Sequence, residues 1–411
     1  MPTFRSIDLF AGCGGLSLGL HKAGWDGVLA MERDPMAFET FYTNLVADGS
    51  PYRAYSKWPD WLPKQPSDIV AALADRTVRE GLTALRGSIQ LVAGGPPCQG
   101  FSVGGARNGR DERNQLVHHQ LDVIDMVRPD VALVENVEGI TRAFRARPGA
   151  DATEPSVADQ VVEALSQLGY AADYGVVDAR NFAVPQARRR TIIIGIRNDL
   201  GVAPGAFFDA LAESPDELYT ILGLPKRTVT AREAIDDLSN PGVRVTCPDS
   251  VKFESTRYRK ATSSYARLMR VGARAGSIPD SHRFSEHGER IQALYALAHA
   301  TQPKGRLRKE FLLANGTKKD KKVLIAPDTP VSTITTHPDE FIHYAEPRNV
   351  TVREMARLQS FPDNFHFKGR YTINGPRRRF DVARCSQVGN AVPPHFAQAI
   401  GMAIKQVLNG K

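Results

Sequence analysis

Short apolar runs alternate with helix-like patterns through the first half of the chain. Six runs have the length and composition of buried strands, and they lie at residues 6–10, 27–31, 89–93, 131–135, 172–177 and 191–196. Helical patterns between the first of them cover residues 16–23, 35–44 and 69–73. Because strands that alternate with helices form doubly wound sheets, the pattern predicts an α/β fold with a mostly parallel sheet.

The alternation fades after residue 197. Residues 198–346 mix short strand and helix signals with prolines and positive charge, which is typical of a second, smaller domain of mixed structure. Regularity returns near the end, where a Pro-Pro pair precedes an apolar helical pattern over residues 395–408. We therefore expect a first domain over 1–197, a second over 198–346, a hinge over 347–380, and a return to the first domain over 381–411.

Composition narrows the class of protein. The four cysteines of the 411 residues lie far apart and form no CxxC pair, which argues against a zinc site and a disulfide framework. No apolar run approaches the roughly 18 residues of a membrane span, and the chain opens directly on an apparent strand instead of a signal peptide. These features predict a cytoplasmic protein without a metal.

Positive charge is concentrated in the second domain. Residues 241–330 hold 18 Lys and Arg against 8 Asp and Glu, whereas the whole chain has a net charge of +8. A solvated basic face is the usual explanation of such a run. Here basic residues alternate with Tyr258 and Tyr265, which favours a surface for nucleic acid. The basic residues concerned are Arg257, Arg259, Lys260, Arg267, Arg270 and Arg274.

A rigid turn follows the third predicted strand. Residues 94–102 read GGPPCQGFS and set Cys98 at the carboxyl edge of the sheet, where open α/β folds bind ligands. A buried structural cysteine is the alternative. The Pro-Pro pair before Cys98 and the glycines after it favour a nucleophile on a stiff turn, followed by a flap over residues 101–113.

A glycine-rich turn follows the first predicted strand, in the sequence DLFAGCGG at residues 8–15. Glycines allow backbone N–H groups to approach a ligand at a helix N-terminus. Glu32 ends the second strand, where such folds place an acid on a ribose. Asp34 is expected to cap the next helix, and Asp68, beside Ile69, is either an adenine contact or another helix cap.

Two further stretches carry polar groups at strand ends. Glu135 ends the fourth strand, where a carboxylate needs a partner or a proton; a helix cap or an ion pair with an arginine is the alternative. QARRR, at residues 186–190, precedes the sixth strand. Alternation puts Gln186, Arg188 and Arg190 on one face and Arg189 on the other.

In order, DLFAGCGGLSLGL, GGPPCQGFS, ENV, QARRR, TVREMARLQSFPD and RCSQVGNAVPP resemble the motifs of the C5-cytosine DNA methyltransferases of bacterial restriction-modification systems. The resemblance covers about the first 197 and the last 60 residues, and it places the family's variable target-recognition domain between them. It implies a Rossmann-like, S-adenosylmethionine-dependent fold.

The resemblance implies a role for each matching residue. Cys98 would be the nucleophile, Glu135 would engage cytosine N3 and the amino group, and Arg188 and Arg190 would contact the base and its surroundings. Glu32 would bind the ribose of S-adenosylmethionine. The remaining cofactor contacts would come from Phe10, Gly12, Cys13, Gly14, Gly15, Asp68, Ile69, Pro97, Asn390 and Val392.

The implied reaction begins when the Cys98 thiolate attacks C6 of a cytosine flipped out of duplex DNA, and a methyl group then passes to C5. S-adenosylhomocysteine would be the other product. The implied protein is a monomer, bacterial or phage-encoded, that acts on double-stranded DNA, with a cognate restriction endonuclease or defence system as a further partner. A tRNA methyltransferase and an inactive DNA-binding scaffold are the alternatives.

Overall fold

The computed structural model describes residues 4–97, 115–142, 155–274, 276–317, 321–337, 339–372 and 381–410. The chain forms two compact units. Unit 1 takes in Met1–Ala179, Arg189–Glu217 and Phe396–Lys411, and unit 2 takes in Arg180–Arg188 and Leu218–His395.

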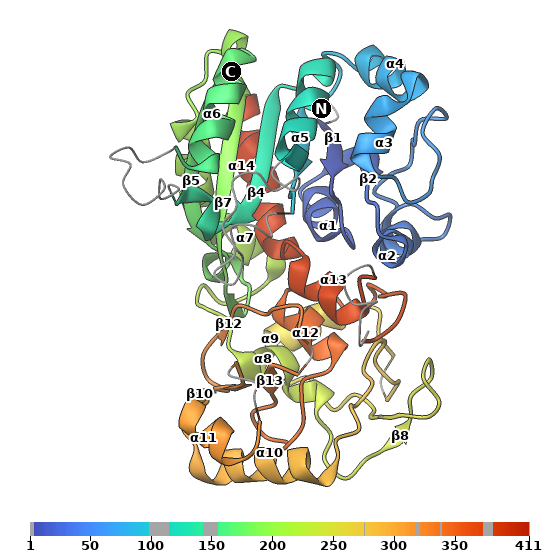
Figure 1. Cartoon of the computed structure of the whole chain (residues 1–411), viewed down its shortest axis with the longest axis vertical. Helices are drawn as coiled ribbons and strands as arrows, with labels where there is room; N and C mark the ends of the chain where they lie inside the picture. Colours follow the sequence, from blue (N-terminus) through green and yellow to red (C-terminus); the bar gives the residue numbers. More distant parts are fainter. Residues whose placement is uncertain are drawn as a thin grey trace. The chain divides into compact units, whose positions relative to one another are not determined.

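Unit 1 is built on a six-stranded sheet in the order β2-β1-β3-β4-β7-β5 (Figure 1). Strands β2, β1, β3 and β4 run parallel to one another, and β7 runs antiparallel to β4 and β5. This confirms the predicted α/β fold with a mostly parallel sheet. The strands are β1 (Phe4–Leu9), β2 (Trp25–Met31), β3 (Leu91–Gly94), β4 (Val131–Val137), β5 (Tyr170–Asp178) and β7 (Arg189–Arg197).

Helices cover this sheet, and Figure 1 shows α6 in front of β5 and β7 with α14 behind them. The C-terminal helix packs on the beginning of the chain, because Trp25 Nε1 donates to the Gly401 carbonyl at 3.0 Å. The helices are α1 (Gly15–Lys22), α2 (Pro35–Leu45), α3 (Ile69–Ala74), α4 (Arg76–Ala84), α5 (Gln115–Val127), α6 (Val157–Gln167), α7 (Gly205–Leu222) and α14 (Pro394–Asn409).

Unit 2 has short elements joined by long irregular segments. Its strands form the three-stranded sheet β10-β11-β13 and the pairs β12–β6 and β8–β9. They are β6 (Gln186–Ala187), β8 (Val245–Thr246), β9 (Glu254–Ser255), β10 (Gly305–Arg306), β11 (Val323–Leu324), β12 (Val331–Ser332) and β13 (Phe341–Ile342). The helices are α8 (Ala231–Ile235), α9 (Ser264–Met269), α10 (Glu289–Thr301), α11 (Lys309–Ala314), α12 (Val352–Leu358) and α13 (Arg384–Asn390).

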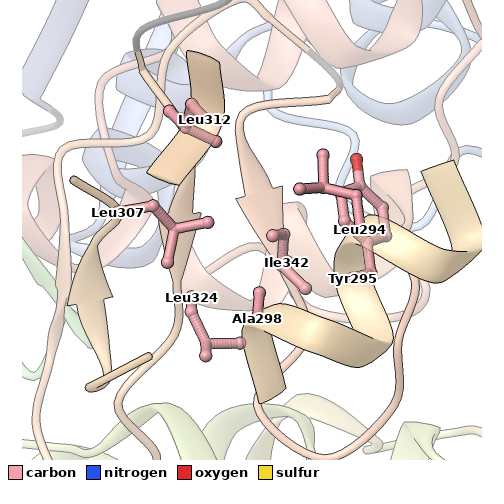
Figure 2. Packing of buried hydrophobic residues seen from close by; sticks show 7 residues of the cluster. All are labelled: Leu294, Tyr295, Ala298, Leu307, Leu312, Leu324 and Ile342. Atoms are coloured by element: carbon pink, nitrogen blue, oxygen red, sulfur yellow. The ribbon is translucent and has the colours of Figure 1, made fainter. Parts of the chain in front are cut away.

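A small apolar core holds α10, α11 and the three-stranded sheet together. Figure 2 shows side chains from these elements converging on one another. They are Leu294, Tyr295, Ala298, Leu307, Leu312, Leu324 and Ile342. Buried Lys322 donates to the Tyr295 hydroxyl at 2.9 Å and so satisfies its ammonium at the edge of this core. Leu307 points inward while Arg306 and Arg308 on either side are exposed, which leaves a basic edge on this part of unit 2.

Ion pairs form a second, polar core in unit 2 around α12. Arg357 is fully buried and contacts Asp237 at 2.9 Å and Asp363 at 2.7 Å. Arg348 pairs with buried Glu354 at 2.7 Å. Burying such charges is tolerable only when each has partners, so the charged residues of the stretch TVREMARLQSFPD are primarily structural.

Candidate active site

A left-handed turn joins β1 to α1 in unit 1. Phe10, Gly12 and Gly14 have positive φ angles of 58°, 56° and 95°. A side chain at Gly14 would put Cβ 2.5 Å from Leu45 Cδ1, so any other residue there requires Leu45 to move and strains the left-handed backbone. Gly14 is also the N-cap of α1, so backbone N–H groups of the loop are presented at a helix N-terminus. The loop has the form needed to approach a polar ligand with its backbone.

Glu32 ties this loop to the end of β2. Its carboxylate accepts the N–H of Gly12 at 2.9 Å and the N–H of Asp34 at 2.7 Å. Burial raises the pKa of Glu32, and the two backbone hydrogen bonds oppose that rise. Each carboxylate oxygen has a further lone pair, so Glu32 can accept hydroxyl groups of a ligand while it holds the loop.

Buried side chains of β1, α1 and the segment after α2 hold the turn between β1 and α1 in place. Burial raises the pKa of the Cys13 thiol to about 12, so Cys13 is a protonated, apolar part of the turn and no nucleophile. Ser17 in α1 donates to Asp8 in β1, and its hydroxyl lies 2.7 Å from the Tyr55 hydroxyl. Burial raises the pKa of Asp8 to about 7. These contacts fix the start of α1 against the sheet.

Asp34 and Asp68 both cap helices. Asp34 accepts from the N–H groups of Met36 and Ala37, which confirms the predicted cap of α2. Asp68 accepts from Val70 and Ala71 at the start of α3, while Ile69 is buried. The cap explains Asp68 without a ligand, and its contact with an adenine stays a prediction.

The turn after β3 is held by its neighbour β4. The two strands are parallel, with Gly94 opposite Val134, so the turn and Glu135 lie at the same edge of the sheet. Asn136 Nδ2 donates to the Pro96 carbonyl at 3.0 Å. A Cβ on Gly95 would lie 3.2 Å from Glu135 Oε2, so the carboxylate lies directly beside the turn. Pro97 is the last described residue of it, and Cys98 and the flap at 101–113 lie outside the described residues.

Glu135 and Arg190 form a buried ion pair. Arg190 Nε lies 3.0 Å from Glu135 Oε1, and each residue is 8% exposed. Burial lowers the pKa of Arg190, and Glu135 opposes that change. The antiparallel pairing of β4 with β7 brings the two side chains together, with Arg190 opposite Val137. Exposed Arg189 pairs instead with Glu138 at 3.4 Å.

In unit 2, Gln186 and Arg188 are buried, which confirms the predicted alternation along QARRR. Arg188 donates to the carbonyls of Ile334, Gly389 and Ala391, at 3.3, 3.1 and 3.0 Å. These contacts fix the backbone on both sides of Asn390. The catalytic role of Arg188 stays a prediction, and these contacts favour a positioning role for it.

Asn390 ends α13 with an exposed side chain, and Val392 is buried two residues later. The backbone before them is closely packed, because a Cβ on Gly389 would lie 2.4 Å from the Thr335 carbonyl oxygen. Both residues belong to unit 2. Their contact with a cofactor stays a prediction.

The aromatic residues of the basic stretch are internal, contrary to their predicted place on a nucleic-acid surface. Tyr258 donates to Asp363 at 2.6 Å and Tyr265 donates to the Arg357 carbonyl at 2.7 Å, and both are buried. Arg270 stacks on Tyr258 at 4.3 Å. Alternating Arg and Tyr look alike in a core and on a surface, so the sequence could not distinguish them. Arg257, Lys260, Arg267 and Arg274 are exposed.

A shallow cavity of about 520 Å³ in unit 1 lies away from Glu135 and from the turn after β3. Its lining residues precede β3, β4 and β5 or lie at and after the end of β7, so it is at the opposite edge of the sheet from Glu135. Arg86 donates there to the carbonyls of Asp125 and Met126 at the end of α5. The arginines of this cavity therefore stabilise helix ends and chain turns, and the candidate site is at the other edge.

Sequence reasoning gave no role to Asn136, although it adjoins Glu135 in the ENV motif. The contact of Asn136 with Pro96 spans 40 residues and depends on strand order. Among the residues that the structure describes, no cluster of three or more His, Cys, Asp and Glu side chains is placed to hold a metal ion. No helix in the described ranges is long and apolar enough to cross a membrane.

Comparison with known proteins gives a consistent picture. The model of the family C-5 cytosine-specific DNA methylase matches residues 4–406. The Type II methyltransferase M.XorII of Xanthomonas oryzae is 30% identical over 434 residues, which cover 98% of this chain and 85% of that protein. M.PspPI of Psychrobacter is 30% identical over 415 residues, or 99% of this chain and 80% of that protein.

Solved structures share the fold. A prophage-encoded protein of E. coli, assigned as a DNA modification methyltransferase, superposes with a TM-score of 0.65 at 24% identity, covering 99% of this chain and all of that one. The Dnmt2 methyltransferase of S. pombe gives a TM-score of 0.53 at 16% identity, with 99% of each chain covered.

Proposed function

The chain belongs to the C-5 cytosine-specific DNA methylase family, and on that premise we propose that it methylates a flipped-out cytosine in duplex DNA through a covalent bond from Cys98 to C6. Its relatives are Type II methyltransferases, so the resemblance read from the motifs is confirmed. The proposal adds the cofactor, the nucleophile and the role of each residue.

The observation that carries the proposal is the position of Glu135. Its carboxylate lies beside Gly95, three residues before Cys98, and is held by Arg190 at 3.0 Å. A carboxyl group beside a nucleophile can donate to or share a proton with N3 of a cytosine, which offsets the charge that develops during attack at C6. Arg190 then fixes the carboxyl group in position.

The loop between β1 and α1 suits S-adenosylmethionine, which supplies the methyl group when bound. Gly12 leaves open space for a ligand at the backbone, and Glu32 retains lone pairs for the ribose hydroxyls. We assign further contacts to Phe10, Cys13, Gly15, Asp68, Ile69, Pro97, Asn390 and Val392, which match the family's motifs.

In the proposed chemistry the Cys98 thiolate forms a bond to C6, and this raises the electron density at C5. After C5 has gained the methyl group, a water molecule accepts the C5 proton. The electrons of that C–H bond form the C5–C6 double bond, and the bond from C6 to Cys98 breaks with its electron pair returning to sulfur. The thiolate is thereby regenerated. Because C5 and C6 are stacked inside a duplex, the base has to leave the helix first, at a cost of a few kcal/mol.

Transfer of a labelled methyl group tests the proposal. Purified protein is given S-adenosylmethionine with either duplex DNA or tRNA, and Cys98→Ala serves as the inactive control. We expect label in the duplex with wild-type protein and none with the variant. Label in tRNA alone would identify an RNA methyltransferase, and label in neither would favour a DNA-binding scaffold. Both results contradict the proposal.

The names of the relatives also suggest a restriction-modification context. We propose that a cognate endonuclease cuts the sequence that this chain methylates. Bisulfite sequencing of a plasmid that carries the gene would define the methylated site, and resistance of that plasmid to an endonuclease of the same specificity would support the pairing.

A further inference from the structure

The hairpin of β8 and β9 in unit 2 ends in a compact, hydrogen-bonded turn. Cys247 N–H donates to the Phe253 carbonyl at 2.9 Å, which extends the pairing beyond the two strands. Within the turn, Ser250 N–H donates to the Cys247 carbonyl at 3.2 Å and Phe253 N–H donates to the Ser250 carbonyl at 2.8 Å. Little backbone freedom is left between residues 247 and 253.

A stack of alternating aromatic rings and guanidinium groups supports this turn. The Arg283 guanidinium lies 4.1 Å from the Phe253 ring and 4.2 Å from the Tyr371 ring. Arg384 lies 4.3 Å from the same Tyr371 ring. The stack therefore runs Phe253, Arg283, Tyr371, Arg384, and it joins the hairpin to two segments that are distant in the sequence.

Asp249 adds a polar connection at the same place. Its carboxylate accepts the Tyr371 hydroxyl at 2.7 Å, pairs with Arg384 and accepts the Cys247 thiol at 3.2 Å. Burial opposes ionisation, yet the hydrogen bond from Tyr371 and the ion pair with Arg384 hold the pKa of Asp249 below its ordinary value. The turn is thus held by both stacking and charge.

The tip of this rigid hairpin presents an apolar side chain to solvent. Val251 is 73% exposed, the highest exposure of any large hydrophobic residue among those described, and Lys252 beside it is also exposed. Neither side chain contributes to the stack. The turn is held firmly while the Val251 and Lys252 side chains are largely open to solvent, so the tip is available for contact with a partner.

We propose that the β8–β9 hairpin is a DNA-reading element, in which Val251 contacts a base edge and Lys252 a phosphate. An apolar tip fits the C5-methyl group of a thymine in the major groove, and an ammonium beside it fits the DNA backbone. Rigid support lowers the ordering cost of such a contact. This inference rests on the proposed function, because it assumes that the substrate is duplex DNA.

Specificity profiling tests the inference. Duplexes with randomised positions around a cytosine are methylated, and the modified cytosines are read by bisulfite sequencing. Val251→Ser is compared with wild type, and Val271→Ser is the matched control, since Val271 is 66% exposed and lies outside the hairpin. We expect Val251→Ser to reduce discrimination about 10-fold at one position and to leave the others unchanged. Val271→Ser should retain the wild-type profile.

Lys252→Ala should behave differently from Val251→Ser. It should weaken binding to all duplexes alike and reduce the slope of log K against log salt by about one. Arg283→Leu removes the central layer of the stack, so it should relax discrimination at the position that Val251 reads.

The outcomes separate two failures. An active wild type with an unchanged Val251→Ser profile, or with equal changes in Val251→Ser and Val271→Ser, would overturn the role of the hairpin alone. A wild type that methylates no duplex would overturn the proposed function and this inference together. Because Val251 is exposed, its substitution should leave the melting temperature unaltered.

Discussion

Single residues at the edge of the sheet show how the candidate site is prepared. Glu135 and Arg190 are both buried and lie 3.0 Å apart, and removing either would leave a buried charge without its partner. Breaking such a pair typically costs about 3–5 kcal/mol of stability. The pair is therefore a structural feature, and in the proposed mechanism its Glu135 carboxyl group also engages cytosine N3.

Glu135→Gln tests the second role. The amide keeps the size of the side chain but shares no proton with N3, so we expect methyl transfer to fall about 10²- to 10⁴-fold in a single-turnover assay. Glu138→Gln is the matched control, because Glu138 is partly exposed and pairs with exposed Arg189. Equal activity of the two variants would contradict the role of Glu135.

Cys13 provides a test at the same scale. Burial raises the pKa of its thiol to about 12, so the thiolate is negligible near neutral pH. We expect Cys13 to resist iodoacetamide in the native protein, as shown by peptide mass spectrometry. Rapid alkylation at Cys13 would show that the turn is more open than described.

At the scale of elements, the loop between β1 and α1 was predictable and several partners in the site were not. Glycines after a buried strand identify a ligand loop directly, and the parallel sheet follows from strand–helix alternation. The contacts of Arg188 with Ile334, Gly389 and Ala391 span 146 to 203 residues. Adjacent arginines in QARRR therefore have different partners for reasons that only tertiary structure supplies.

Two substitutions distinguish conformation from packing in this loop. Gly12 has a φ of +56° and open space around its Cβ position, so Gly12→Ala should cost about 1–2 kcal/mol from the left-handed backbone alone. Gly14→Ala adds a collision with Leu45, for which overpacking typically costs a further 1–3 kcal/mol or so.

Urea denaturation measures both losses, and titration with S-adenosylhomocysteine reports whether the loop still binds its ligand. We expect weaker binding in Gly14→Ala than in Gly12→Ala. If Gly14→Ala were the more stable variant, the described approach of Leu45 to this turn would be wrong.

At the scale of the whole molecule, the two units are stabilised differently. Unit 1 has a sheet in which β3 and all of β4 except its last residue are buried, whereas unit 2 relies on buried ion pairs around α12. Apolar alternation in a sequence reveals the first kind of core. The second kind has no periodic pattern, so Arg348, Arg353 and Arg357 resemble surface residues until the fold is known.

The polar core predicts acid sensitivity. Burial lowers the pKa values of His282 and His343 to about 4, so both imidazoles are neutral in the folded protein at neutral pH. An unfolded chain binds protons at these residues below about pH 6.5, hence folded-state stability falls as pH drops from 6.5 towards 4. The loss amounts to about 2 kcal/mol for each imidazole at pH 5. The pKa of Glu354 is lowered from 4.5 to about 2, so the protein loses further folding stability as the pH falls below 4.5.

Urea unfolding at pH 7, 6 and 5 would measure this dependence. We expect the urea midpoint of the wild type to decrease between pH 7 and pH 5. The midpoint of His282→Gln should decrease less over the same interval. A midpoint that is constant from pH 7 to 5 would show that the two imidazoles are not buried in neutral form.

A covalent trap gives the most direct test of the proposed mechanism. Duplex DNA with 5-fluorocytosine at the target position is incubated with the protein and S-adenosylmethionine. A base cannot remove the fluorine at C5 as it removes a proton, so the bond from Cys98 to C6 persists. We predict a stable complex whose crosslinked peptide maps to Cys98. A crosslink at another residue, or none with a preparation that methylates ordinary duplex DNA, would contradict the account.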